Sequence, residues 1–197
     1  MRYDAQHKER TRERVLKEAA RAIRQDGPHR VSVADVMGKA GLTHGGFYAH
    51  FKSRDELIAE GIRQMFRESA ERVGQSMEGR GPREALVDYI GFYLSPAHRD
   101  TRTAGCPLPF LSADAPRLPD PARAVFASGV AALEDRLAGL LSATGREHAA
   151  DDAASLVAEL VGALALARAE PDDERAYAML RDARARILGR LGLEAAR

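Results

Sequence analysis

The sequence predicts an all-α protein, with a module of three helices followed by a larger helical bundle. Apolar residues recur at helical spacing in nearly every segment, and no stretch alternates with the period of a β-strand. Glycines, prolines and capping residues divide the chain into segments of helical length. The 197 residues, 45% of them hydrophobic, are enough to bury a sizeable core.

Four helices are expected in the first part of the chain. They span about residues 8–26, 33–40, 43–50 and 53–77. Gly27-Pro28 ends the first, and Gly41 ends the second in the left-handed conformation that closes many helices. Ser32, Thr43 and Ser53 are the expected N-caps of the other three, because their hydroxyls can accept a bond from a free backbone N–H.

Four further helices complete the bundle. They span about residues 82–94, 121–142, 148–169 and 172–191. The segment between the first two of these, about 95–121, contains six prolines. Proline removes a helix hydrogen bond, so we expect a loop there with short helical turns at most.

Charge is unevenly distributed along the chain. The whole sequence has 30 basic and 29 acidic residues, a net charge of +1. Residues 1–54 hold 12 basic and 6 acidic residues, a balance of +6, whereas residues 55–197 hold 18 and 23, a balance of −5. A basic first quarter on an acidic remainder indicates that this end of the chain meets a polyanion.

The densest signal lies at residues 32–52. Two short helices around a glycine turn, preceded by a longer helix, are the layout of a helix-turn-helix module. The apolar residues expected to face inward are Val33, Val36, Met37, Leu42, Phe47 and Phe51. The outer surface then consists of Thr43, His44, Gly45, Gly46, Tyr48 and His50. We therefore expect a helix-turn-helix domain at 1–53 and a second helical domain at 54–197.

Gly45 and Gly46 fall inside the second short helix, where each costs about 1 kcal/mol relative to alanine. Absent side chains let a helix lie deep in a groove or close to a phosphate. Tyr48, His50 and Lys52 then supply hydrogen-bond donors beside it. The alternative is a glycine loop in which Tyr48 and Phe51 are ordinary core residues.

Residues 10–66 resemble the DNA-binding domain of the TetR family of one-component bacterial regulators. The resemblance rests on the runs Val31–Val36, Ala40–Thr43 and Gly46–Leu57, above all on Phe-Tyr-Ala-His-Phe-Lys-Ser-Arg-Asp at 47–55. The remainder of the chain is similar to the family only in being helical. The Gly45-Gly46 pair departs from the bulkier residues that are commoner in the family, so specificity is expected to depend partly on DNA shape.

The resemblance implies roles for particular residues on double-stranded DNA. Thr43, His44 and Gly45 occupy the positions that meet bases or adjacent phosphates in the major groove. The residues implied to hold the phosphate backbone are Tyr48, His50, Lys52 and Arg54, with Ser32 and Val33 at the start of the preceding helix. These implications agree with the general use of helix N-termini and first helical turns in DNA recognition.

The last two helices, at about 149–191, are the expected interface of a homodimer. They interleave alanine and glycine with leucine and valine over a surface too wide for one buried stripe. TetR-like proteins generally dimerise through their last two long helices, and a symmetric dimer suits an inverted-repeat operator. A monomeric core is the alternative.

An effector site is less clearly marked in the sequence. The residues that could line an apolar pocket between helices are Tyr89, Phe92, Tyr93, Phe110, Phe126 and Met179. The alternative is that they are ordinary core residues. His98 and Arg102, near the proline-rich segment, are either contacts to a polar ligand or solvated side chains.

Cys106, the single cysteine, is a candidate sensor of electrophiles or oxidants. It follows several basic residues, and nearby positive charge favours the reactive thiolate. The Gly105-Cys106 pair also resembles a TetR subgroup that includes electrophile-responsive repressors. The alternative is a small buried side chain of no special reactivity.

The sequence contains no nucleophile elbow, phosphate loop, dinucleotide fingerprint or metal-ligand cluster, so we expect neither an enzyme nor a cofactor or metal site. The longest apolar run, Leu160–Ala167, is too short for a membrane span, and we expect a cytoplasmic protein. The expected function is a DNA-binding repressor that an unidentified small molecule or electrophile releases from DNA. The alternative is a DNA-binding regulator controlled by a protein partner.

Overall fold

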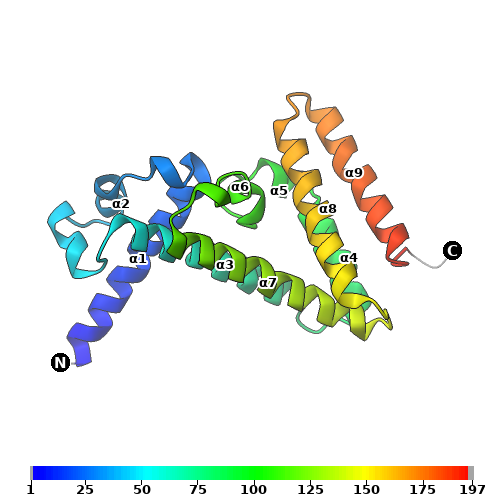
Figure 1. The fold of residues 1–197 in the computed structure, drawn as a ribbon, viewed down its shortest axis with the longest axis horizontal. Coiled ribbons are helices and arrows are strands. Elements are labelled where there is room, and N and C mark those ends of the chain that lie inside the picture. Colours follow the sequence, from blue (N-terminus) through cyan, green and yellow to red (C-terminus); the bar gives the residue numbers. More distant parts are fainter. Residues whose placement is uncertain (1, 195–197) are drawn as a thin grey trace. The chain divides into compact units, whose positions relative to one another are not determined.

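The computed structural model of the protein describes residues 2–194, and every regular element in that range is helical (Figure 1). The expectation of an all-α fold is confirmed. Within the same range, none of the helices combines the length and the apolar character that crossing a membrane requires.

The helices follow the order expected from the sequence. The first elements are α1 (Arg2–Asp26), η1 (Pro28–Arg30), α2 (Val33–Lys39), η2 (His44–Ala49) and α3 (Arg54–Met77), of which η1 and η2 are 3₁₀ helices. Next come α4 (Pro82–Tyr93), α5 (Pro96–Asp100), α6 (Leu108–Leu111) and the 3₁₀ turn η3 (Ala115–Arg117). The last are α7 (Asp120–Ala143), α8 (Ala149–Ala169) and α9 (Asp173–Arg190). The proline-rich segment therefore forms only short turns, as expected, whereas α1 begins several residues earlier than expected.

Local capping chemistry sets several of these bounds. The Ser32 hydroxyl accepts a hydrogen bond from the Asp35 backbone N–H at 3.3 Å, and the Ser53 hydroxyl accepts one from Glu56 at 3.1 Å. Gly41 has a φ of 73°, in the left-handed region that residues with a Cβ rarely adopt. The expected caps Ser32 and Ser53 and the expected stop at Gly41 are thus confirmed.

The chain forms two compact units that are interleaved in sequence. The first comprises residues up to Ser69 together with Arg102–Gly129, and the second comprises Ala70–Thr101 together with the residues from Val130 onward. Two long helices, α3 and α7, each contribute to both units. The division into functional domains at residues 53 and 54 stays a prediction.

The core of the first unit joins α1, α2, η2 and α3 with the segment that follows residue 102. Val15, Phe47 and Ile62 lie in one buried cluster with Leu111 and Leu118. At the end of α1, the buried Arg24 donates to the Glu68 carboxylate at 2.8 Å and to the Met65 carbonyl at 3.3 Å, which fixes α1 against α3. The helix-turn-helix elements are therefore packed against the buried core of the first unit.

The second unit is organised by the hairpin of α8 and α9, which pack against each other (Figure 1). The Asp172 side chain caps α9 by accepting a hydrogen bond from Arg175 N–H at 2.8 Å. α4 contacts both helices of the hairpin, and α5 contacts α8. The buried residues of α4, α8 and α9 include Leu86, Ile90, Leu156, Leu164, Leu180 and Ile187.

Candidate nucleic-acid interface

The turn between α2 and η2 is closed by backbone hydrogen bonds. The Gly41 N–H donates to the Gly38 carbonyl and the Leu42 N–H to the Met37 carbonyl, both at 2.9 Å. This arrangement uses carbonyls that the end of a helix leaves without intrahelical partners. The chain is thereby turned sharply, and η2 begins three residues after Gly41.

The expected short helix after Thr43 is present, but it is a 3₁₀ helix. The Gly46 N–H donates to Thr43 O at 3.1 Å and the His50 N–H donates to Phe47 O at 2.9 Å, both with the three-residue spacing of that helix. Two glycines weaken the preference for a regular α-helix, which accounts for the difference. Thr43 is the N-cap residue, but its side chain makes no capping hydrogen bond.

η2 is anchored by its aromatic residues. Phe47 and Phe51 are buried, and their rings stack with centroids 5.6 Å apart. The Tyr48 ring contacts the edge of Phe47 but is 74% exposed. Phe47 and Phe51 therefore hold the segment in place while the tyrosine hydroxyl stays available to a partner.

Four of the six residues predicted for the outer surface are exposed, and the other two are not fully so. Thr43, His44 and Gly45 are exposed, whereas Gly46 and His50 are half-buried. A Cβ atom built at Gly45 meets no heavy atom within 4 Å, and one at Gly46 meets only ordinary contacts, the nearest at 3.7 Å from Met37 Cε. Neither glycine has a positive φ. The packing of the protein thus gives no reason for two glycines here.

The residues predicted to hold phosphates are arranged around this surface. Ser32 and Val33 are half-buried at the start of α2, and Val33 packs against the core. Lys52 is exposed between η2 and α3, where its backbone N–H donates to the Glu56 carboxylate at 2.6 Å. The Lys52 ammonium group therefore extends from a fixed backbone position beside η2.

Arg54 is held more tightly than the sequence suggests. Its Nε donates to the Val31 carbonyl at 3.2 Å, and its Nη2 donates to the Pro28 and His29 carbonyls at 2.8 and 3.0 Å. These bonds tie the start of α3 to η1 and to the residue just before the Ser32 cap. Arg54 thus positions the module in this structure, and of the guanidinium nitrogens only Nη1 is left out of these three bonds.

His50 closes η2 beside two basic residues of α1 that the sequence pattern alone did not single out. Burial lowers the pKa of His50, and the positive charges of Lys8 and Arg12 lower it further. The Arg12 guanidinium lies over the Phe51 ring, 5.0 Å from its centroid. Lys8 and Arg12 are four residues apart, and this spacing was the available signal that they share a face of α1.

The residues expected at an effector site are distributed over both units. In the second unit, Tyr89 and Tyr93 are buried and Phe92 is 47% exposed, while Met179 lines a surface groove between α8 and α9. In the first unit, Phe110 and Phe126 are half-buried against the core, and Cys106 is buried at 5% exposure. Arg102 is exposed. The burial of Cys106 agrees with the packing alternative considered for it.

His98 lies on the short helix α5 and is not the solvated loop side chain that the sequence offered as one alternative. It is 3% exposed, stacked on Phe92 at 5.2 Å, and its Nδ1–H donates to the Tyr93 carbonyl at 2.9 Å. Burial lowers the pKa of His98 to about 4, with Arg168 and Arg72 adding to the decrease and the Tyr93 carbonyl opposing it. His98 is therefore neutral at physiological pH.

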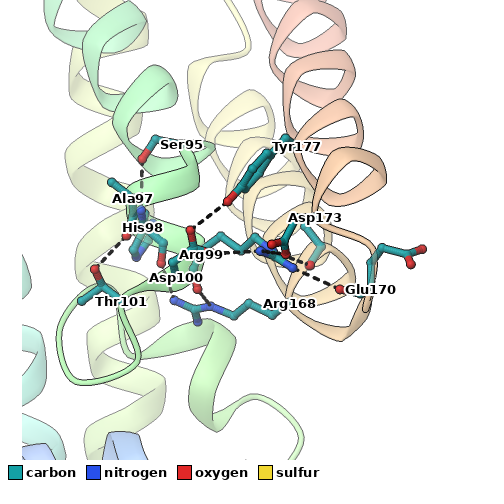
Figure 2. Close-up of polar contacts among 11 residues, drawn as sticks. Ser95, Ala97, His98, Arg99, Asp100, Thr101, Arg168, Glu170, Asp173 and Tyr177 are labelled. Carbon is teal, nitrogen blue, oxygen red and sulfur yellow. Dashed lines mark hydrogen bonds and ion pairs between the residues drawn. The ribbon is translucent and has the colours of Figure 1, made fainter.

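Two arginines join α5 to the end of α8 (Figure 2). Arg99 of α5 donates to the Ala167 and Glu170 carbonyls at 2.9 and 3.1 Å, and Arg168 of α8 donates to the His98 and Arg99 carbonyls at 2.8 and 3.2 Å. Each arginine thus satisfies the free carbonyls at the end of the other helix. Figure 2 also shows Arg99 beside Asp173, whose carboxylate it contacts at 2.8 Å.

The hairpin of α8 and α9 presents an apolar surface. Leu166 is 63% exposed, and it lines a groove with Ala163, Ala178, Met179 and Ala183. The rim of this groove carries both signs of charge, from Arg175, Asp182 and Arg186. Leu166 is thus the most exposed of the large aliphatic residues in the described part of the chain.

Comparison with known proteins agrees with this geometry. The family model for bacterial regulatory proteins of the tetR family matches residues 15–60, which include the whole helix-turn-helix segment. An HTH-type transcriptional regulator of Mycobacterium tuberculosis (strain CDC 1551 / Oshkosh), MT0206, is 31% identical over 170 residues, which cover 82% of this chain and 86% of the relative.

Two solved structures share the fold. The reduced form of E. coli NemR has a TM-score of 0.76 at 21% identity, covering 91% of this chain and 96% of that one. A TetR-family regulator from Cytophaga hutchinsonii has a TM-score of 0.79 at 18% identity, covering 93% and 96%. Together with the family match and the 31% identical relative, these results identify the chain as a member of the TetR family of DNA-binding transcriptional regulators.

Proposed function

We propose that this regulator is a homodimeric repressor that binds an inverted-repeat operator and leaves it when a small molecule or electrophile binds. The observation that carries the proposal is the surface of η2. Thr43, His44 and Gly45 are exposed on a segment that is held in place by the buried, stacked rings of Phe47 and Phe51. Such a surface, rigidly held and without a side chain at Gly45, suits insertion into the major groove.

Thr43 and His44 are the residues proposed to contact bases, because their side chains carry hydrogen-bonding groups at the start of η2. Gly45 and Gly46 let the backbone approach the duplex closely. Tyr48 and Lys52 bind phosphate oxygens on one side, and the free N–H groups at the start of α2, next to Ser32 and Val33, bind them on the other. The phosphate contacts fix the register in which Thr43 and His44 meet the bases.

The α8–α9 hairpin is the proposed dimer interface. A solvent-exposed Leu166 beside half-buried Ala163 and Met179 is costly in a monomer and favourable when a second copy covers it. The small residues allow two hairpins to approach closely. In an isologous dimer, Arg175 and Arg186 of one copy can meet Asp182 of the other across the two-fold axis.

Effector control is proposed to act as a population shift between a state that fits the operator and one that does not. The half-exposed Phe92, stacked on His98 near the buried Tyr89 and Tyr93, is the candidate apolar contact for a ligand in the second unit. The aromatic residues Phe110 and Phe126 are the candidates in the first. An electrophile would instead act through Cys106, and Cys106→Ser must then remove the response.

Selection of bound DNA from a random duplex pool tests the proposal. The expected result is an inverted repeat whose two half-sites lie one or more helical turns apart. Absence of enrichment at low salt would overturn DNA recognition by η2, and enrichment of a single asymmetric site would overturn the homodimer. A compound that raises the melting temperature and weakens binding to the selected duplex would support effector control.

A further inference from the structure

The first three turns of α1, residues 2–12, hold four basic and two acidic residues. Residues 6–10 are all exposed, because the buried face of α1 begins only at Thr11. The Arg12 guanidinium lies 5.0 Å from the centroid of the Phe51 ring, next to His50, and Lys8 lies one turn earlier on the same face of α1. The charges of both residues also lower the pKa of His50. Since His50 is the C-cap of η2, this face of α1 lies beside the end of the segment proposed to enter DNA.

Among the described side chains, Glu60 is the acidic group that pairs with this face of α1. The Glu60 carboxylate lies 3.7 Å from the Arg12 guanidinium, but it is closer to Arg63, at 3.3 Å. Arg12 also packs on the Phe51 ring, so its position is fixed by the core of the module. Lys8, one turn earlier, forms no ion pair within the set of side chains that the structure describes, which begins at residue 6. Two like charges on one face of a helix repel each other, and a bound anion relieves this repulsion.

We propose that Lys8 is a DNA phosphate contact, so that each copy of the protein holds the backbone from α1 as well as from the Lys52 segment. The inference rests on the proposed insertion of η2 into duplex DNA, because η2 places His50 and its neighbours at the duplex. Arg12 is a positioning residue in this arrangement: it maintains the positive potential beside Lys8 while it packs on Phe51.

The contact adds affinity without adding base specificity. A lysine ammonium on phosphate is attracted to every sequence alike, and its contribution comes from the release of condensed counterions. Because α1 is anchored at its other end through Arg24 and Glu68, the contact also links the position of α1 to the DNA-bound state. A movement of α1 relative to η2 would separate Lys8 from its phosphate and weaken binding.

Lys8→Gln tests the proposal, with Lys17→Gln as the matched control. Lys17 is exposed and lies nine residues, or two and a half turns, further along α1, on the opposite face. Both variants remove one positive charge from the same helix. Binding of the full-length protein is measured over a series of salt concentrations, with the duplex selected from the random pool and with a duplex of unrelated sequence.

For Lys8→Gln, the slope of log K against log salt should become less steep by about 0.9 for each copy that binds. This corresponds to roughly eightfold weaker binding per copy at about 0.1 M salt, equal for the two duplexes. Lys17→Gln should keep the wild-type slope. Phosphate ethylation should also lose its effect at one position per half-site only in the Lys8 variant.

An unchanged slope for Lys8→Gln, or an equal loss in both variants, would overturn the role of Lys8 while leaving DNA binding by η2 intact. A loss confined to the selected duplex would also overturn it, because a phosphate contact does not distinguish sequences. If the wild-type protein binds neither duplex, the proposed function itself fails. The melting temperatures of both variants should equal that of the wild type, which excludes unfolding as the cause.

Discussion

Replacing Gly45 with alanine is expected to change the stability of the free protein and its affinity for DNA in opposite directions. A Cβ at this position meets no heavy atom within 4 Å, and the residue does not have a positive φ. Alanine therefore fits the free protein without a clash and loses less conformational entropy on folding. The free energy of unfolding should rise by up to about 1 kcal/mol. For a chain of this length, the melting temperature then rises by roughly 2–4 °C at most.

DNA affinity should change in the opposite direction. A methyl group placed where the η2 backbone approaches the duplex over-packs a close contact, at a cost of about 1–3 kcal/mol. At about 1.4 kcal/mol for each tenfold change, binding weakens by roughly 5- to 140-fold per copy. A more stable protein that binds DNA less well is the signature of a glycine retained for a partner.

Fluorescence anisotropy with the selected duplex and thermal unfolding of the free protein measure the two effects. Gly139→Ala is the control, because Gly139 is exposed on α7 and a Cβ there also meets nothing within 4 Å. It should show the gain in stability without the loss in affinity. Wild-type affinity in Gly45→Ala, or a fall in its stability, would refute the reasoning.

Three further predictions concern other parts of the protein. His98 is neutral when folded, with a pKa of about 4, and takes up a proton on unfolding below pH 6.5. Stability should therefore fall by about 2 kcal/mol between pH 7 and 5, and His98→Gln should flatten this dependence in urea titrations at the two pH values. Leu166→Glu should convert a dimer to a monomer in analytical ultracentrifugation, since a carboxylate at the centre of an apolar interface loses its hydration; an unchanged mass would exclude the hairpin. Arg54→Met should cost about 2 kcal/mol of stability, because three carbonyls lose a charged donor. If its unfolding is unchanged and only its salt slope decreases, Arg54 is a phosphate contact instead.

The helix bounds were largely predictable because short-range chemistry sets them. Ser32 and Ser53 cap through hydroxyls that accept from the backbone three residues further on, and Gly41 ends α2 through its own φ angle. The alternation of buried Phe47 and Phe51 with exposed Tyr48 follows from helical spacing alone. The family resemblance depended on these same local features.

Contacts between distant segments were not predictable from the sequence. In the sequence, Arg54 has the pattern expected of a further phosphate contact. Only the fold brings the three carbonyls of residues 28, 29 and 31 within its reach. His98 lies in a segment whose prolines and charges are typical of a solvated loop, yet Phe92 and Tyr93 enclose its ring. The role proposed for Lys8 depends on the packing of Arg12 of α1 over Phe51, next to His50. In each case the partner lies on another element, whose packing no local pattern specifies.

The central claim, that the exposed face of η2 inserts into duplex DNA, is tested most directly by hydrogen exchange of the full-length protein with and without the selected duplex at low salt. Peptides covering residues 43–52 should exchange more slowly when DNA is bound. Peptides from α7, which is not proposed to touch DNA, should be unchanged. Saturating DNA that leaves exchange at residues 43–52 unaltered would contradict the claim.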